Sequence, residues 1–322
     1  MPKALLFTTF LCLGPLPALQ AVDAFSPVER ALGGSSVFDP APYADQDLDE
    51  EKRFAPESAG DSDLGEQLIL ARAPRRAPIR LEADTGVFWS DNIAAATPAL
   101  ETDGWFWANR GGLTWRPRIG DNLFVDTFVF EDVYRYDRGP LDFESTEAGV
   151  GLVKIFPEWG DLLLFGRYEF LYVHADNPAI SFFSPKSHLT NRFHRLRFGA
   201  HKVFLSAPRH TAYLGTEALF DLDASPARLE RHEFGLRTGY TFHATDKLKL
   251  TAIARATYLD YQNGPREDWH YATGLEVTYL LTDRTRLFAS LLYGKNDSNS
   301  FGGINDYEAI QGGIGAGLHL AF

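Results

Sequence analysis

Between residues 78 and 322 the chain repeats one pattern, in which apolar side chains occupy every second position over segments of ten to fifteen residues. Alternation with a period of two is typical of β-strands, because successive side chains of a strand point to opposite faces. Strands of globular proteins are usually about five or six residues long. Segments of this length therefore favour strands that cross a lipid bilayer.

Counting the alternating segments gives roughly twelve strands. They lie at 79–90, 105–116, 122–136, 144–156, 161–174, 192–205, 210–222, 230–243, 247–261, 268–281, 285–295 and 306–322. Two of them, 122–136 and 285–295, are apolar on both parities, so their outward face stays ambiguous. An even number of strands is what single-chain bacterial outer-membrane barrels require.

The connections sort into two kinds that alternate along the chain. Five are tight, at 118–122, 157–161, 206–210, 243–247 and 281–285. Six are longer or more polar, near 91–104, 137–143, 175–191, 223–229, 262–267 and 296–305. A soluble β-sandwich also has alternating strands, but it does not explain this sorting. The sequence predicts an all-β fold, a transmembrane antiparallel up-and-down β-barrel of about 12 strands over 78–322.

The last segment keeps its alternation to the final residue. The outward set is Ile314, Ala316, Leu318, Leu320 and Phe322. Lipid offers no hydrogen bonds, so a membrane sheet must close and its last strand must pair with its first. This ending resembles the recognition signal of outer-membrane barrels. The resemblance implies that Phe322, Leu320 and Leu318 act as a membrane-insertion signal, and that the barrel-assembly machinery is a partner beside outer-membrane lipid.

Residues 1–21 have the features of a secretory signal peptide, with Lys3 ahead of a short apolar run and small residues near its end. Cys12, the single cysteine, lies in that run. The mature chain is therefore expected to use no disulfide and no thiolate metal site. Cleavage would remove Lys3 and change the formal net charge from −12 to −13. We expect no nucleic acid partner for such an acidic chain.

Residues 22–77 have a different composition from the segments that follow. They carry twelve acidic side chains against six basic ones, with many Pro and Ser residues and weak hydrophobic periodicity. This composition predicts a periplasmic extension that is mostly disordered. Residues 62–73 are the exception and could form one short helix with Ser62 as its N-cap.

The parity opposite to the apolar one predicts the side chains that face the barrel interior. Charged side chains on the lipid face are costly, about 2–4 kcal/mol for Arg or Lys at mid-bilayer, so charged residues are expected to face inward. The predicted pore-lining residues are Arg167, Glu169, Arg195, Arg197, Glu217, Glu233, Arg237, Arg255 and Glu276. A barrel of about twelve strands lies between filled and open ones, so these charges could either line a pore or fill it with ion pairs.

Other functional patterns are less complete. Serine and histidine residues that a lipid-modifying barrel enzyme would need are scattered, at His174, His194, His201, His270, Ser181, Ser184 and Ser290. Trp105 and Trp107 suit either a membrane-interface girdle or a sugar-stacking platform. Residues 297–308 match a calcium loop at several positions but place Phe301 where an oxygen ligand is expected. No cofactor motif is present, and the expectation is that the chain is not an enzyme.

The sequence of residues 86–96, GVFWSDNIAAA, combines an aromatic residue with Asp91 and Asn92 just before a predicted external loop. It resembles the opening strand of the outer-membrane β-barrel porin families. The resemblance implies a barrel in the outer membrane of a Gram-negative-type bacterium, with the extension in the periplasm, and it assigns no catalytic or binding residue. The function expected from the sequence is a small passive pore for polar or anionic solutes. The alternatives are a non-conducting structural or surface-interaction barrel and a lipid-modifying enzyme.

Overall fold

The computed structural model describes residues 78–93, 101–138, 142–176, 188–207, 209–303 and 305–322. The expected signal peptide at 1–21, the acidic extension at 22–77 and the helix expected at 62–73 lie outside the described residues. Helical structure in the described part consists of three 3₁₀ turns, η3 (Pro157–Trp159), η4 (Ala227–Leu229) and η5 (Phe301–Gly303). None of the described helices is long and apolar enough to cross a membrane.

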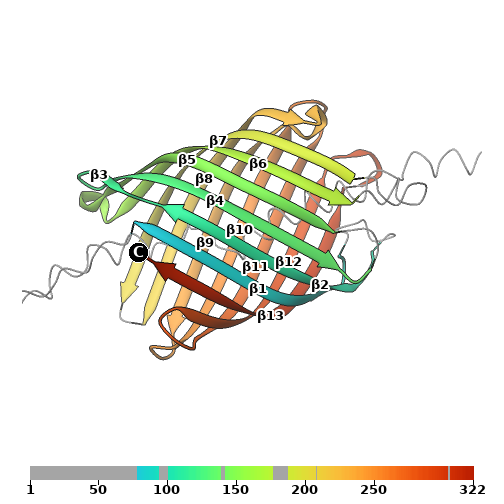
Figure 1. The fold of residues 1–322 in the computed structure, drawn as a ribbon. Helices are drawn as coiled ribbons and strands as arrows, with labels where there is room; N and C mark the ends of the chain where they lie inside the picture. Colours follow the sequence, from blue (N-terminus) through green and yellow to red (C-terminus); the bar gives the residue numbers. More distant parts are fainter. Residues whose placement is uncertain (1–77, 94–100, 139–141, 177–187, 208, 304) are drawn as a thin grey trace, which may run out of the picture.

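The described residues form one antiparallel sheet of twelve long strands and one short one (Figure 1). The strands are β1 (Ile79–Ser90), β2 (Gly104–Trp115), β3 (Arg118–Gly120), β4 (Leu123–Tyr136), β5 (Phe143–Phe156), β6 (Leu162–Asp176), β7 (His188–Ala207), β8 (His210–Ser225), β9 (Arg231–His243), β10 (Leu248–Tyr261), β11 (Glu267–Leu280), β12 (Thr285–Ser298) and β13 (Tyr307–Ala321). Each long strand pairs with its neighbour in the chain, and β3 only prolongs the hairpin of β2 and β4.

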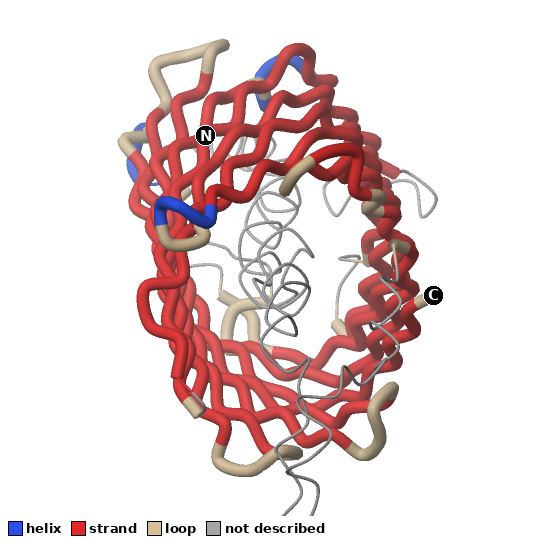
Figure 2. Tube along the Cα trace, turned by 90° about the vertical axis from the view of Figure 1, so that its left-hand side faces the viewer, coloured by secondary structure: helices blue, strands red, loops and turns tan. Residues whose placement is uncertain are grey.

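The sheet closes on itself between the first and last strands. β1 pairs with β13 in a register that places Leu81 opposite Leu320, and with β2 on its other side. Beyond the strand end, the backbone N–H of Phe322 donates to the carbonyl of Ile79 at 2.9 Å. Figure 2 shows the resulting ring of strands. The predicted closed barrel of about twelve strands is confirmed, and no long strand is left with a free edge.

The connections alternate between the two ends of the barrel. The end that carries Ile79 and Phe322 also carries the tight turns, at 116–122, 157–161, 208–209, 244–247 and 281–284. The opposite end, called the loop end below, carries the connections 91–103, 137–142, 177–187, 226–230, 262–266 and 299–306. The predicted difference in length is not uniform, because 226–230 and 262–266 are as short as the turn at 157–161. These two connections differ from the tight turns in polarity and in the end of the barrel where they lie, not in length.

The two faces of the sheet differ as the alternation predicts. In β11, Trp269, Leu275 and Val277 are 47%, 59% and 43% exposed on the outer face. Asp268 and His270 of the same strand are buried inside the barrel. Many large apolar side chains are exposed on the other strands as well, so the outer surface of the barrel is predominantly apolar. Apolar surface of this extent suits contact with lipid or protein rather than water.

The outer face also includes Trp105 and Trp107, which are 54% and 52% exposed and lie near the loop end of β2. Their parity is opposite to that of the buried Phe106. The choice between an interface girdle and a sugar-stacking platform stays a prediction, but either would lie on the outer face of the barrel. An outward position near a strand end agrees with an aromatic girdle at a membrane interface.

The structure assigns faces to the two segments that were ambiguous. In β4 the even positions point inward, including Phe124, Asp126 and Phe128, while Val129 is 43% exposed outside. In β12 the even positions again point inward, and Leu291 is 53% exposed outside. Both strands looked two-sided because their inward faces contain aromatic or aliphatic residues beside polar ones.

Several strands extend farther toward the loop end than the sequence predicted, among them β6, β7, β8 and β12. β7 begins at His188 rather than at residue 192, and β8 extends to Ser225, so the connection between β6 and β7 is 177–187 instead of 175–191. The added part is polar and includes Asp223, which lies 3.7 Å from Arg192 with both side chains more than half exposed. A criterion based on apolar alternation ends where the apolar residues end, whereas backbone pairing continues past them.

The interior is not uniformly polar. Near the loop end, buried apolar residues of β1, β2, β4 to β8 and the adjoining connections form a packed group, the loop-end aromatic cluster. Its members are Phe88, Ile93, Phe106, Tyr134, Phe143, Leu171, Val173, Phe193, Ala224 and Leu229. Phe88 stacks on Phe106 with 5.4 Å between ring centroids, and Tyr134 stacks on Phe143 at 4.3 Å. The sequence-based assignment of a charged lumen missed this cluster.

Candidate functional site: the charged interior

The interior contains a continuous series of alternating charges that extends around the sheet from the end of β2 to β10. Its members are Arg116, Asp126, Arg167, Glu169, Arg197, Glu217 and Arg255, and we call it the central ion-pair series. Arg116 directly follows β2, and the other members come from β4, β6, β7, β8 and β10. Each points inward because it has the parity of the buried positions on its strand.

The first half of the series is linked by ion pairs at Asp126 and Glu169. Arg116 Nε lies 2.5 Å from Asp126 Oδ1, and Arg167 Nη1 lies 3.7 Å from the second oxygen of Asp126. Arg167 also pairs with Glu169. Glu169 accepts a hydrogen bond of 2.8 Å from Arg197 as well.

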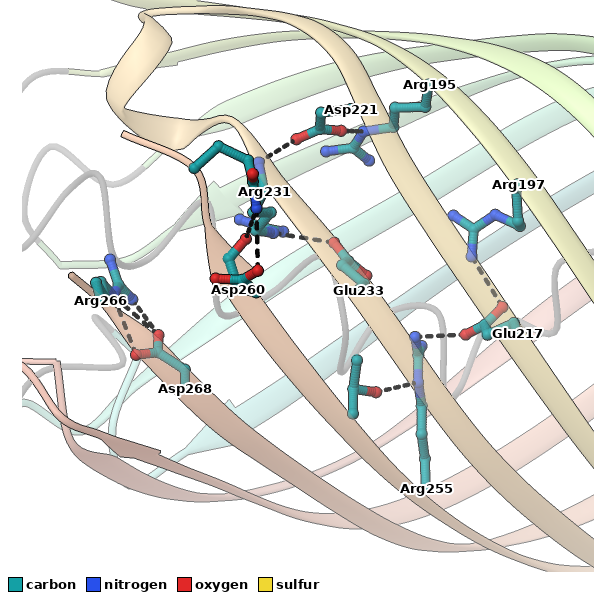
Figure 3. Close-up of polar contacts among 12 residues, drawn as sticks. Arg195, Arg197, Glu217, Asp221, Arg231, Glu233, Arg255, Asp260, Arg266 and Asp268 are labelled. Atoms are coloured by element: carbon teal, nitrogen blue, oxygen red, sulfur yellow. Dashed lines mark hydrogen bonds and ion pairs between the residues drawn. The ribbon is translucent and has the colours of Figure 1, made fainter. Parts of the chain in front are cut away.

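The second half of the series is centred on Glu217. Its carboxylate accepts hydrogen bonds from Arg197 Nη1 at 2.9 Å and from Arg255 Nη2 at 2.6 Å. The Nε of Arg255 donates to the hydroxyl of Thr257 at 2.9 Å. Figure 3 shows Glu217 between the two guanidinium groups. One carboxylate thus joins β7 to β10 across β8 and β9.

All side chains of the series are at most 5% exposed. Charged groups withdrawn from water require partners, because the desolvation cost of an ion is several kcal/mol. Alternation supplies these partners, and aromatic rings add to them. The guanidinium carbon of Arg167 lies 4.8 Å from the ring centroid of Phe128 and 5.7 Å from that of Phe165.

A second group of ion pairs lies toward the loop end (Figure 3). Arg195 donates to Asp221 at 3.0 Å, and the other oxygen of Asp221 accepts from the backbone N–H of Arg231 at 3.0 Å. The side chain of Arg231 donates to Glu233, also at 3.0 Å. These contacts connect β7, β8 and β9 on the loop-end side of the central series.

Of the nine predicted pore-lining residues, the structure brings five into the central series, namely Arg167, Glu169, Arg197, Glu217 and Arg255. Arg195 and Glu233 belong to the loop-end group. Arg237 is buried in the interior beside His201, where Gly215 leaves room for both side chains. Glu276 belongs to neither group of ion pairs. Its side chain is half-buried and accepts a hydrogen bond from Thr278 at 2.6 Å.

Sequence reasoning missed Asp126, which joins Arg116 to Arg167 in the series, and Asp221. Asp126 lies in the segment that is apolar on both parities, so no lumen face was assigned there. The signal that could have found it is the even-numbered run Phe124, Asp126, Phe128 and Phe130, because an acid among lipid-facing phenylalanines is unfavourable. That argument would also have revealed the aromatic part of the interior.

The charges are distributed unevenly around the interior. Inward-facing charged residues on β6 to β10 comprise seven basic and four acidic side chains: Arg167, Arg195, Arg197, Arg231, Arg237, Lys249, Arg255, and Glu169, Glu217, Asp221, Glu233. The remaining described strands, with Arg116, carry the reverse: Arg80, Arg110, Arg116, Arg286, and Glu82, Asp84, Asp126, Asp132, Glu147, Asp268, Glu276. The described interior is therefore balanced overall, with a basic sector over β6 to β10.

The three residues of the expected insertion signal lie at the end of β13 and just after it. Leu318 is 37% and Phe322 66% exposed, and Leu320 is half-buried. They share the outward parity of Ile314, which is 69% exposed. Their role in assembly stays a prediction.

The structure also places residues of the enzyme hypothesis and of the suspected calcium loop. Ser290, the one serine of the enzyme hypothesis among the described residues, is buried, and its Oγ has no hydrogen-bond partner within the described part. His194 instead contacts the hydroxyl of Tyr168. In the suspected calcium loop, Lys295 Nζ lies 3.0 Å from Asp297 and 3.8 Å from Glu308, between two of the supposed ligands. Among the described residues, no group of three or more His, Cys, Asp or Glu could hold a metal ion.

No protein-family model and no curated protein matches the sequence. In three dimensions the chain is similar to an outer membrane channel from Pseudomonas putida F1, with 10% identity and a TM-score of 0.49, over 76% of this chain and 96% of that one. It is also similar to the KdgM porin, with 7% identity and a TM-score of 0.37, over 74% and 98% of the two chains.

A third similar structure is the translocator domain of the autotransporter NalP from Neisseria meningitidis, with 13% identity and a TM-score of 0.40, over 75% of this chain and 88% of that domain. Similarity at these levels carries no residue and no activity over to this chain. The barrel is established by its own strand pairing, and the properties of its interior follow from its own side chains.

Proposed function

We propose that this chain is an outer-membrane channel through which small polar solutes diffuse, with a preference for anions. The observation that carries the proposal is a closed ring of twelve long strands that is apolar outside and rich in ionic groups inside. Lipid can contact such an outer surface, and closure satisfies the backbone hydrogen bonds that lipid cannot.

The size of the ring supports a channel. Twelve strands about 4.8 Å apart and tilted by about 40° give a backbone diameter of about 24 Å. Inward side chains from opposite walls narrow this width. A diameter of about 24 Å is still large enough for a passage that admits small solutes. In single-chain outer-membrane barrels the short turns face the periplasm. The end with Ile79 and Phe322 is therefore proposed to face the periplasm, where the acidic extension would lie.

The basic sector over β6 to β10 supports the preference for anions. The arginines of this sector are at most 9% exposed, so they would act on a passing anion through their electrostatic potential rather than by direct contact. The acidic residues of the opposite wall would guide cationic groups of the same solute or their counterions. Because the interior is balanced overall, the expected selectivity is moderate.

The test is the conductance of the exported chain in planar bilayers under a KCl gradient. Discrete channels with a reversal potential on the anion side are expected. Arg255→Gln should shift the reversal potential toward cations and Glu233→Gln toward anions, since each removes one interior charge of opposite sign. Arg135→Gln, outside the barrel near the loop end, is the matched control and should shift nothing. Folded chain without conductance would refute the proposal.

A non-conducting barrel is the second candidate, and the loop-end aromatic cluster favours it because stacked rings occupy part of the interior. In that case the chain would stay silent in bilayers while remaining folded. Phe106→Ala would then open a conducting path by removing a ring that stacks on both Phe88 and Tyr136. A lipid-modifying enzyme would instead hydrolyse lipid in the same preparation.

A further inference from the structure

One region of the outer face departs from the apolar pattern. Thr85 on β1, Asn109 on β2, Glu131 on β4 and Thr146 on β5 all have the outward parity of their strands. The strand registers place Thr85 opposite Asn109, and Glu131 opposite both Thr146 and Gly111. These four polar residues and Gly111 are neighbours on adjoining strands, and we call them the outer polar patch.

The patch lies within apolar surroundings. Along β4, the outward neighbours of Glu131 are Val129 and Val133, and along β1 those of Thr85 are Ala83 and Val87. Trp107 pairs with Arg135, four residues beyond Glu131 toward the loop end. Glu131 is therefore farther from the loop end of the barrel than Trp105 and Trp107 are. The outward carboxylates Glu308 and Asp297, by contrast, lie within one residue of a loop-end strand boundary.

The hydrogen bonds of the patch do not use all of its polar groups. Trp107 Nε1 donates to Thr85 Oγ1 at 2.7 Å, and Thr85 Oγ1 donates to Asn109 Oδ1 at 2.8 Å. Thr146 Oγ1 donates to Glu131 Oε2 at 2.5 Å. Within the described part, the amide N–H groups of Asn109 and the Oε1 atom of Glu131 have no partner.

Gly111 leaves open space within the patch. A Cβ added to Gly111, between Asn109 and Leu113, would meet no heavy atom within 4 Å. The missing side chain lets another surface approach Asn109 and Glu131 closely. Hydrocarbon chains of lipid could fill this space, but they accept and donate no hydrogen bonds.

We propose that the outer polar patch is the contact face between two copies of this chain in the membrane. In a two-fold arrangement each surface element meets its own counterpart. The unused N–H groups of Asn109 then face the unused carboxylate oxygen of Glu131 in the partner, and the same bond forms a second time by symmetry. A patch with one spare donor group and one spare acceptor is complementary to itself, which favours a second copy over a partner of a single charge.

The first test uses cysteines, since Cys12 is the only natural one and lies in the expected signal peptide. Gly111→Cys in the full-length exported chain should form a disulfide-linked dimer on mild oxidation in native membranes. Ala254→Cys, equally outward on β10, is the matched control, and the wild type controls for Cys12. Cross-linking of Gly111→Cys no stronger than that of Ala254→Cys would overturn the proposal.

The second test measures the monomer–dimer equilibrium in nanodiscs by native mass spectrometry. Glu131→Leu removes both symmetric hydrogen bonds to a charged group and should weaken dimerisation about 100-fold. Glu131→Gln keeps an acceptor and should weaken it less. The heat-dependent gel shift of a folded barrel verifies that each variant is folded. A wild-type chain that stays monomeric at every density tested, or a Glu131→Leu chain that dimerises as well as the wild type, refutes the contact, whatever the barrel conducts.

Discussion

Glu217 offers the sharpest test of the central ion-pair series. Its carboxylate contacts Arg197 at 2.9 Å and Arg255 at 2.6 Å, and the three side chains are 4%, 2% and 5% exposed. Replacement by Ala leaves Arg255 with the hydroxyl of Thr257, which carries no charge. Arg197 keeps Glu169. Removing one partner of a buried pair costs about 3–5 kcal/mol, and we expect the lower end because one arginine stays paired.

The assay is urea-induced unfolding of the barrel in lipid vesicles, followed by tryptophan fluorescence. Glu144→Ala is the matched control, since it removes a carboxylate from the pair with Arg135, whose side chains are 44% and 41% exposed. Exposed pairs contribute about 0–1 kcal/mol. The double variant Glu217→Ala/Arg255→Met should cost less than the sum of the single changes, because it also removes the uncompensated charge. A cost below about 1 kcal/mol for Glu217→Ala would refute the idea that the series acts as a buried network.

Three further outcomes are expected. Val150→Arg places a cation on the lipid face of β5, where Val150 is 52% exposed, and should lower the free energy of unfolding in vesicles by about 2–4 kcal/mol; an unchanged value would mean that water or protein covers this face. Phe106→Ala removes a stacked ring and should cost about 3–5 kcal/mol by the same measurement, whereas a small cost would show that the cluster is loosely packed. Lys295→Ala should change stability by less than about 1 kcal/mol, because Lys295 and its partner Asp297 are a third to a half exposed; a larger loss would indicate a buried role for this loop.

The sequence alone determined the strands, their number and the sidedness of most of them. Period-two alternation in β11 or β13 states which residues face out, because a strand has only two faces and lipid tolerates few charges on one of them. The five predicted residues that meet in the central series, Arg167, Glu169, Arg197, Glu217 and Arg255, were recognised as inward by this rule. It was silent for β4, whose inward face mixes Phe128 with Asp126.

Only the tertiary structure decided which inward residues contact one another. The alternation along a strand shows which side of the sheet a residue faces, but not its position along the barrel axis. The register between strands sets that position, and so it decides that Glu217 reaches Arg197 and Arg255 whereas Glu276 does not. Register depends on pairing along whole strands and on the bulges of β7, which no local pattern reports. The outer polar patch has the same origin, since Thr85, Asn109, Glu131 and Thr146 lie on different strands and become neighbours only through the register in which β1, β2, β4 and β5 pair.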